Sequence, residues 1–207
     1  MSVPTQRQAY AFLSPLRGRS SAFLVAGREE NAMVTRFALG CLAGLKTKTV
    51  MLDTSCFYGT NIQVLTEGLP REFLERTIVL TVGDDTGPEV ALTELIAKKE
   101  AKAILIDDLN SLNALMSSGE QKSSIHELFV LIRILSYHAR INGVSILTTV
   151  YKSQRTDANS RRSLAAAADL QITTETDSSS IIFRCDGTDV WPSRRFVATS
   201  DYLALRT

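Results

Sequence analysis

Apolar and polar positions alternate along this chain in blocks that predict strands followed by helices. Short, continuous apolar runs are typical of strands buried on both faces. They occupy residues 22–26, 49–53, 77–81, 103–107 and 144–150. Between these runs, apolar residues recur three or four positions apart, as they do along one face of a helix. This second pattern covers about residues 30–44, 62–74 and 121–141.

Two further features place helix ends. Gly87 and Pro88 open a helix whose apolar residues are expected to face inward; these are Val90, Leu92, Leu95 and Ile96. Asn142 and Gly143 supply a C-terminal stop for the helix at about 121–141. Strands that alternate with helices form parallel sheets through right-handed crossovers, so we expect helices on both faces of the sheet.

The pattern changes after residue 150, first to a polar, basic stretch and then to three pieces typical of hairpins, at about 168–174, 180–185 and 189–198. The expected fold class is therefore α/β, a mainly parallel central sheet flanked by helices, with an antiparallel C-terminal extension. No repeat and no Pro, Gly or Ser tract divides the chain. We expect one domain over residues 1–207, with 1–20 as an N-terminal lead-in.

Composition narrows the class of protein. Hydrophobic residues make up 44% and charged residues 22%, which is typical of a globular protein. No apolar stretch is long enough to span a membrane, and the first ten residues lack the layout of a signal peptide. The three cysteines and two histidines show no disulfide or metal-ligand spacing. We therefore expect an intracellular protein with no membrane contact and no metal site.

The turn after the first predicted strand is where a nucleotide hydrolase would bind phosphate. A phosphate-binding loop reads GxxxxGK[ST]: its second glycine allows close backbone approach, its lysine meets the phosphates and its hydroxyl holds magnesium. Here the window begins with Gly27 and ends with Ala32, Met33 and Val34, so only the first glycine is retained. Two glutamates in the loop oppose anion binding as well. The alternative is that Gly27 simply closes a strand-to-helix turn.

Acidic residues follow two of the predicted strands. Asp107 and Asp108 end the run at 103–107, where an acid of a nucleotide hydrolase would support magnesium. An acid at this place can also cap the next turn, and that structural alternative remains open. The run at 49–53 leads into Leu52-Asp53-Thr54-Ser55-Cys56-Phe57, whose significance depends on the resemblance described below.

Basic residues gather at 152–162, after the last of the apolar strands. The stretch holds four basic residues against one acid, and the four are Lys152, Arg155, Arg161 and Arg162. Such a loop can neutralise nucleic-acid phosphates, whereas the net charge of +1 for the whole chain gives no broader case for nucleic acid. A solvated surface loop is the alternative.

Five segments, taken in order, resemble the RecA and RadA family of recombinases and its paralogues over about residues 13–187. They are the first strand with its loop, LDTSCF, AILIDDL, the long amphipathic helix and GVSILTTVYKSQ. The resemblance implies that Asp107 matches the magnesium-supporting aspartate. It implies that Ser55 stands where the family has the glutamate that activates water. It also implies that residues 152–167 correspond to a DNA-facing loop.

The resemblance, with these losses, implies a non-catalytic recombinase paralogue with no cofactor and no catalytic residue. Such a protein would bind a recombinase-like subunit in a hetero-oligomer and meet single-stranded DNA through that complex, in the nucleus of a eukaryote or otherwise in the cytoplasm. One alternative is a weak ATPase in which Arg28, Asn31 and Thr35 hold nucleotide in a rearranged loop. A regulatory scaffold subunit unrelated to DNA is another alternative.

Overall fold

The computed structural model describes residues 20–26, 31–82, 90, 101–116, 125–151, 170–177, 180–185 and 194–199. Residues 1–19 of the predicted N-terminal lead-in and most of the helix predicted after Pro88 lie outside these residues, as does the loop at 152–167. Within the described part of the chain, strands and helices alternate as predicted, and no helix there is long and apolar enough to cross a membrane.

The strands form a single eight-stranded sheet in the order β3-β2-β4-β5-β1-β6-β7-β8. Neighbours from β3 to β6 pair in parallel, and the β6-β7 and β7-β8 pairs are antiparallel. The strands are β1 (Ser20–Ala26), β2 (Thr49–Asp53), β3 (Thr77–Thr81), β4 (Ala103–Asp107), β5 (Ser145–Tyr151), β6 (Leu170–Asp177), β7 (Ser180–Cys185) and β8 (Arg194–Thr199). The parallel sheet and its antiparallel extension are confirmed.

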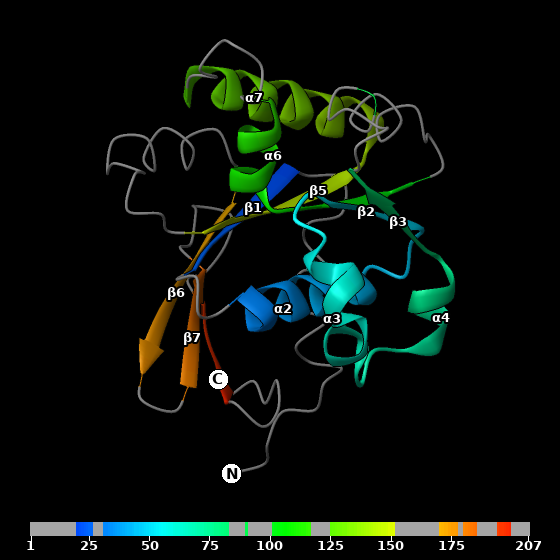
Figure 1. Cartoon of the computed structure of the whole chain (residues 1–207), viewed down its shortest axis with the longest axis vertical. Helices are drawn as coiled ribbons and strands as arrows, with labels where there is room; N and C mark the ends of the chain where they lie inside the picture. The colour runs from blue at the N-terminus through cyan, green and yellow to red at the C-terminus, as the bar shows by residue number, and fades with distance from the viewer. Residues whose placement is uncertain are drawn as a thin grey trace.

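Helices cover both faces of the sheet (Figure 1). On one face lie α2 (Asn31–Gly44), α3 (Phe57–Thr66) and α4 (Arg71–Glu75), and on the other lie α6 (Leu109–Met116) and α7 (Ile125–Asn142). Successive strand residues point to opposite faces, so β4 supplies Leu105 to the core beneath α2 and Ile104 and Ile106 to the core beneath α7. Each face therefore has its own apolar core.

Helix α2 also packs against the antiparallel extension. The rings of Phe37 on α2 and Phe183 on β7 stack with centroids 4.0 Å apart and planes 8° from parallel. Both side chains are buried in the core on the α2 face. The extension is therefore held to the parallel part by a helix as well as by the sheet.

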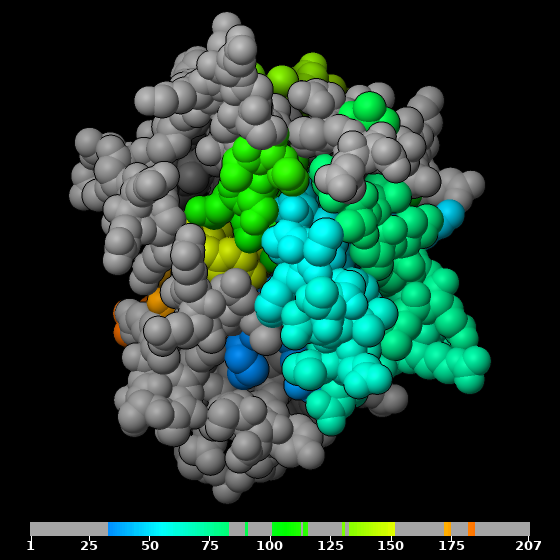
Figure 2. All heavy atoms as spheres, viewed as in Figure 1, coloured from blue at the N-terminus to red at the C-terminus, as the bar shows by residue number. Residues whose placement is uncertain are grey.

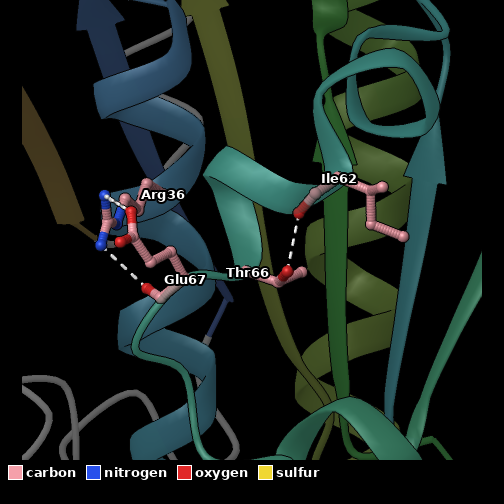
Figure 3. A network of polar contacts seen from close by, with 4 residues as sticks. All are labelled: Arg36, Ile62, Thr66 and Glu67. Atoms are coloured by element: carbon pink, nitrogen blue, oxygen red, sulfur yellow. Dashed lines mark hydrogen bonds and ion pairs between the residues drawn. The ribbon is translucent and has the colours of Figure 1, made fainter.

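The C-terminal end of α3 is fastened to α2 (Figure 3). The guanidinium of Arg36 donates to the backbone carbonyl of Glu67 at 2.8 Å and lies 3.8 Å from the Glu67 carboxylate. Within α3, the Thr66 hydroxyl donates to the Ile62 carbonyl at 2.7 Å. The Glu67 carbonyl follows the last residue of α3 and has no partner within that helix, so the bond from Arg36 satisfies a group that water would otherwise have to reach.

Three details differ from the prediction. The single helix expected at 62–74 is two helices: α3 begins earlier, at Phe57, and Gly68 and Pro70 separate it from α4. Gly68 has a φ of 76°, a left-handed conformation that ends a helix, and Pro70 has no N–H with which to continue one. Helix α6 was not expected, because its eight residues are too few for a clear apolar period.

The third difference concerns Val90, which was expected to face inward but is exposed. Protein surfaces hold many apolar side chains, so an apolar residue at helical spacing is weak support for burial. Leu92, Leu95 and Ile96, predicted with it, lie outside the described residues.

Candidate functional site

Asp107, the last residue of β4, lies at the centre of a buried group of hydroxyl side chains. The Thr35 hydroxyl on α2 donates to its Oδ2 at 2.8 Å. From β5, the Thr149 hydroxyl donates to Oδ1 in a short bond, and the Tyr151 hydroxyl donates to the same oxygen at 3.2 Å. The Thr35 and Tyr151 hydroxyls are also 3.3 Å apart. All four side chains are buried, so the group is a closed polar cluster. We call it the Asp107 cluster.

The strand order explains why these residues meet. Strand β4 lies beside β5, and β5 lies beside β1, and α2 is the next described element of the chain after β1. Parallel strands end at the same edge of a sheet, and ligands of α/β proteins usually bind beyond that edge. Figure 2 shows the surfaces of α3 (cyan), α6 (bright green) and the end of β5 (yellow) adjoining on one face of the molecule. The Asp107 cluster lies at the carboxyl ends of β4 and β5.

Burial governs the electrostatics of the cluster. Removal from water raises the pKa of Asp107 to about 6, with a smaller rise from the nearby Asp108 charge. The hydrogen bonds from Thr149, Thr35 and Tyr151 act in the opposite direction, because they stabilise the carboxylate. Burial and the Asp107 charge also raise the pKa of Tyr151, so its hydroxyl remains a protonated donor. Asp107 therefore titrates within the range in which proteins are commonly handled.

Asp108 has a different, structural set of partners. Its carboxylate accepts from the Ser111 backbone N–H at 2.6 Å and from the Ser111 hydroxyl at 3.1 Å, which caps the first turn of α6. Burial is the main cause that raises the pKa of this carboxyl. The peptide bond between Asp107 and Asp108 is cis. The capping role that was left open at the sequence level is thus the one Asp108 adopts here.

Thr54 joins the ends of β2 and β4. Its backbone N–H donates to the Asp107 carbonyl at 2.9 Å, and its hydroxyl donates to the Asp108 carbonyl at 2.7 Å. The same hydroxyl accepts from the Asp108 N–H at 2.8 Å. These three bonds hold the backbone around Asp107 against the neighbouring strand.

The acid at the end of β2 is committed to a helix start. Both oxygens of Asp53 accept from backbone N–H groups, those of Phe57 and Gly59, each at 3.1 Å. This interaction caps α3 and explains why that helix begins at Phe57. Ser55 and Cys56 lie exposed in the turn before it, and Cys56 has a φ of 56°.

Asn110 on α6 completes the frame around Tyr151. Its amide nitrogen donates to the Tyr151 carbonyl at 3.1 Å, and its amide oxygen accepts from the Tyr151 N–H at 3.1 Å. The backbone of Tyr151 is thereby fixed on the side of β5 that faces α6, which in turn fixes the hydroxyl that reaches Asp107.

The residues predicted for a degenerate nucleotide site are distributed as follows. Asp107 is central, Met33 packs partly buried against the core, Val34 is fully buried in that core, and Ser55 is exposed. Ala32 lies in the first turn of α2. Gly27 lies outside the described residues, as do all four predicted DNA-binding residues, Lys152, Arg155, Arg161 and Arg162.

Three residues beside Asp107 are not among the residues predicted for the nucleotide site. Counting from Gly27 put Val34 at the hydroxyl position, yet the hydroxyl that reaches Asp107 belongs to the next residue, Thr35. Thr149 and Tyr151 lie two apart on a strand and hence on the same face, a signal that was present in the sequence. Among the described residues, no group of three His, Cys, Asp or Glu side chains has a metal-binding arrangement.

Comparison with known proteins defines the fold class. The strand order and the helices on both faces are those of a RecA-like α/β fold. The chain is similar to the crystal structure of the RadB recombinase, with a TM-score of 0.63 and 17% sequence identity over 94% of this chain and 95% of that one. No family model matches the sequence, and no curated protein does. At this identity the likeness concerns the fold.

Proposed function

We propose that this chain is a non-catalytic recombinase paralogue, a mediator that binds a recombinase-like subunit and promotes its assembly or stability on single-stranded DNA. The recombinase fold supports a role in recombination and repair. Fold alone does not determine activity, so the proposal depends on the chemistry of the site. The observation that carries it is the closed state of the Asp107 cluster.

A magnesium-supporting aspartate needs oxygen atoms that can face a hydrated cation. In this chain, Oδ2 of Asp107 accepts from Thr35, and Oδ1 accepts from both Thr149 and Tyr151. The Thr35 hydroxyl also lies in contact with Tyr151, which leaves it less able to turn toward an ion. The cluster is satisfied within the protein itself, and such an arrangement fits a structural centre better than a magnesium and nucleotide site.

The start of α2 supports the same proposal. If Thr35 is the hydroxyl residue of the ancestral loop, Val34 stands where the phosphate-binding lysine would be. Val34 is fully buried among apolar side chains. A lysine amine must reach out to phosphate, whereas this side chain contributes to the core. The start of α2 therefore lacks the amine with which a phosphate-binding loop holds a nucleotide.

One observation favours the alternative of a weak or unusual ATPase. A threonine at the start of the helix after β1, bonded to the acid at the end of β4, is an arrangement on which a nucleotide site can be built. Measurement of nucleotide binding separates this alternative from the mediator role. A scaffold unrelated to DNA would also lack nucleotide binding, so DNA binding separates it from a mediator.

Purification of the chain from cells with its bound proteins, followed by DNA titration of the resulting complex, tests the mediator role. The matched variant changes Arg155, Arg161 and Arg162 to alanine. If these residues contact phosphates, the variant complex should bind single-stranded DNA more weakly at low salt. The slope of the logarithm of its DNA-binding constant against the logarithm of the salt concentration should be shallower by about 0.7 for each lost phosphate contact. A complex without a recombinase-like subunit, or one that does not bind DNA, would contradict the proposal.

A further inference from the structure

Strand β5 extends beyond the end of its pairing with β4. The paired residues of these two strands end at Ile106 and Thr148, whereas β5 continues to Tyr151. On its other side, β5 stays paired with β1 as far as Ala26 and Tyr151. Figure 2 shows the end of β5 (yellow) at the surface beside α6 (bright green). On the β4 side, the last residues of β5 therefore depend on groups other than a strand neighbour to hold their backbone.

The side chain of Asn110 on α6 supplies such groups. Its amide nitrogen donates to the Tyr151 carbonyl at 3.1 Å, and its amide oxygen accepts from the Tyr151 N–H at 3.1 Å. A neighbouring strand in a sheet bonds the N–H and the carbonyl of one residue with its own peptide groups. A side-chain amide has the same donor and acceptor, so Asn110 continues the ladder by one residue. We call these two bonds the Asn110 clamp.

Asn110 is itself held in place. The Asp108 carboxylate accepts from the Ser111 N–H at 2.6 Å, and the Leu112 N–H donates to the Asp108 carbonyl at 3.1 Å. The Thr54 hydroxyl donates to the same carbonyl at 2.7 Å and thereby joins the start of α6 to the end of β2. Asn110 lies half-buried in this first turn of α6. The clamp is therefore built on a fixed support.

Tyr151 is also held by its hydroxyl. That hydroxyl donates to Oδ1 of Asp107 at 3.2 Å and lies 3.3 Å from the Thr35 hydroxyl. The residue is buried, with 6% of its surface exposed. Its backbone is thus tied to α6, and its side chain is tied to β4 and α2. A residue fixed at both ends sets the point and the direction in which the chain leaves β5.

We propose that Asn110 is a positioning residue for DNA binding. Through Tyr151 it fixes the start of the basic segment at 152–162, whose first residue, Lys152, follows Tyr151 directly. A segment whose starting point is already set loses less conformational entropy when it binds phosphates, so it binds them more tightly. The inference rests on the proposed function, because it requires this segment to meet single-stranded DNA.

The packing of α6 does not explain the clamp. Leu109 and Leu112 are fully buried in the core on the α7 face of the sheet, and they hold α6 against it. Burial of two leucines stabilises such a helix more than two hydrogen bonds from a half-buried amide. The consequence specific to Asn110 is the constraint on the backbone of Tyr151.

Amide hydrogen exchange in the free chain tests the clamp itself. Asn110→Ala removes both bonds, so exchange of the Tyr151 amide should become about tenfold faster relative to that of Ile146, at the start of the same strand. The matched control is Asn61→Ala. Asn61 is also half-buried and donates to a backbone carbonyl, that of Phe57 at 2.9 Å, and its loss should leave the ratio unchanged. An unchanged ratio in Asn110→Ala would overturn the inference.

A double-mutant cycle on the complex with its bound proteins tests the role in DNA binding. Asn110→Ala should weaken binding of single-stranded DNA at low salt about two- to tenfold. In the variant that lacks Arg155, Arg161 and Arg162, the same change should have almost no further effect, because Asn110 acts through their segment. Asn61→Ala should have no effect in either background.

A second variant keeps the test decisive. Asn110→Asp retains the acceptor for the Tyr151 N–H and loses the donor to its carbonyl, and it replaces Asn110→Ala if circular dichroism shows that this variant does not fold. Its loss of DNA binding should again disappear in the chain without the three arginines.

The outcomes separate this inference from the proposed function. Equal losses in the two arginine backgrounds, or no loss from either Asn110 variant, would overturn the inference and leave the mediator role standing. Equal DNA binding with and without the three arginines would overturn it as well, because the segment would then make no contribution. A wild-type complex that binds no single-stranded DNA would contradict the proposed function and, with it, the role of Asn110 in DNA binding.

Discussion

At the scale of single residues, the surroundings of Asp107 determine its charge state and the hydrogen bonds at the centre of the site. This residue is a buried carboxylate held by hydroxyls from α2 and β5. Burial disfavours its charged form, and the hydrogen bonds offset only part of that cost. The stability of a folded protein that contains such a group should fall as the pH rises.

Asp107→Asn should remove a pH dependence of stability. The folded-state pKa of Asp107 is raised from 3.8 to about 6, so between these values the folded state binds the proton more readily than the unfolded state. The contribution of Asp107 to stability is therefore most favourable below pH 4 and is lost as the pH rises through 6. The difference amounts to about 3 kcal/mol, at about 1.4 kcal/mol for each of roughly two pKa units.

Urea denaturation of wild type and Asp107→Asn at pH 4, 5, 6 and 7 measures this term. The difference between the two proteins isolates Asp107 from other groups that titrate in the same range, Asp108 among them. Asparagine is neutral and has nearly the same shape, so the variant should gain stability relative to wild type as the pH rises. Curves that stay parallel over the whole range would rule out the raised pKa.

Thr35→Val tests the hydroxyl that joins α2 to Asp107. Valine has nearly the same shape but cannot donate, so one carboxylate oxygen is left without its 2.8 Å partner. The free energy of unfolding should fall by about 1–3 kcal/mol. Thr35→Ser keeps the hydroxyl and should lose less, so equal losses in the two variants would show that the hydrogen bond is not the cause.

The sequence identified Asp107 as the acid at a strand end but not its full set of partners. Thr148 and Thr149 are adjacent, and only the register of β5 against β4 decides which of them faces Asp107. In the same way, one position on a helix separates Val34, which packs in the apolar core, from Thr35, which donates to Asp107. Periodicity locates such faces to within about a residue, and a hydrogen bond depends on a single one.

At the scale of elements, helix ends are the features most open to test. Helix α7 stops at Gly143, whose φ is 62°, and the N–H of Val144 donates back to the Ala139 carbonyl at 2.9 Å. This is the closing bond that follows a glycine in the left-handed conformation. An added Cβ at Gly143 would meet no atom within 4 Å, so only the backbone conformation opposes a substitution there.

Gly143→Ala should therefore destabilise the protein by about 1–2 kcal/mol, the cost of a side chain in the left-handed region. Gly59 in α3 is the matched control, because it also has no atom within 4 Å of an added Cβ and lacks the positive φ. Gly59→Ala should be neutral or stabilise by up to about 1 kcal/mol, since alanine favours helices. Thermal or urea unfolding of both variants measures the contrast, and equal effects would contradict it.

The sequence predicted the strands well and the short helices poorly, for a physical reason. Strands β2, β4 and β5 are buried along their whole length, and such strands appear in sequence as continuous apolar runs. Helix α6 instead begins where Asp108 caps Ser111, and α3 begins where Asp53 caps Phe57. A cap is one side chain that accepts from one or two N–H groups, which leaves no periodic signal.

At the scale of the whole molecule, the RecA-like fold was predicted from the order of partial motifs and is confirmed by the strand order and the likeness to the RadB recombinase. The function cannot be read from the fold in the same way, because a fold supports many chemistries. The central claim is therefore that the Asp107 cluster is a structural centre rather than a nucleotide site.

Isothermal titration of the purified chain with ATP and magnesium tests that claim most directly, with Asp107→Ala as the control protein. We expect no heat beyond dilution, and no difference between the two proteins, up to millimolar ATP, because the oxygens of Asp107 accept from Thr35, Thr149 and Tyr151. Magnesium-dependent binding at micromolar affinity that Asp107→Ala abolishes would contradict it and favour an unusual ATPase.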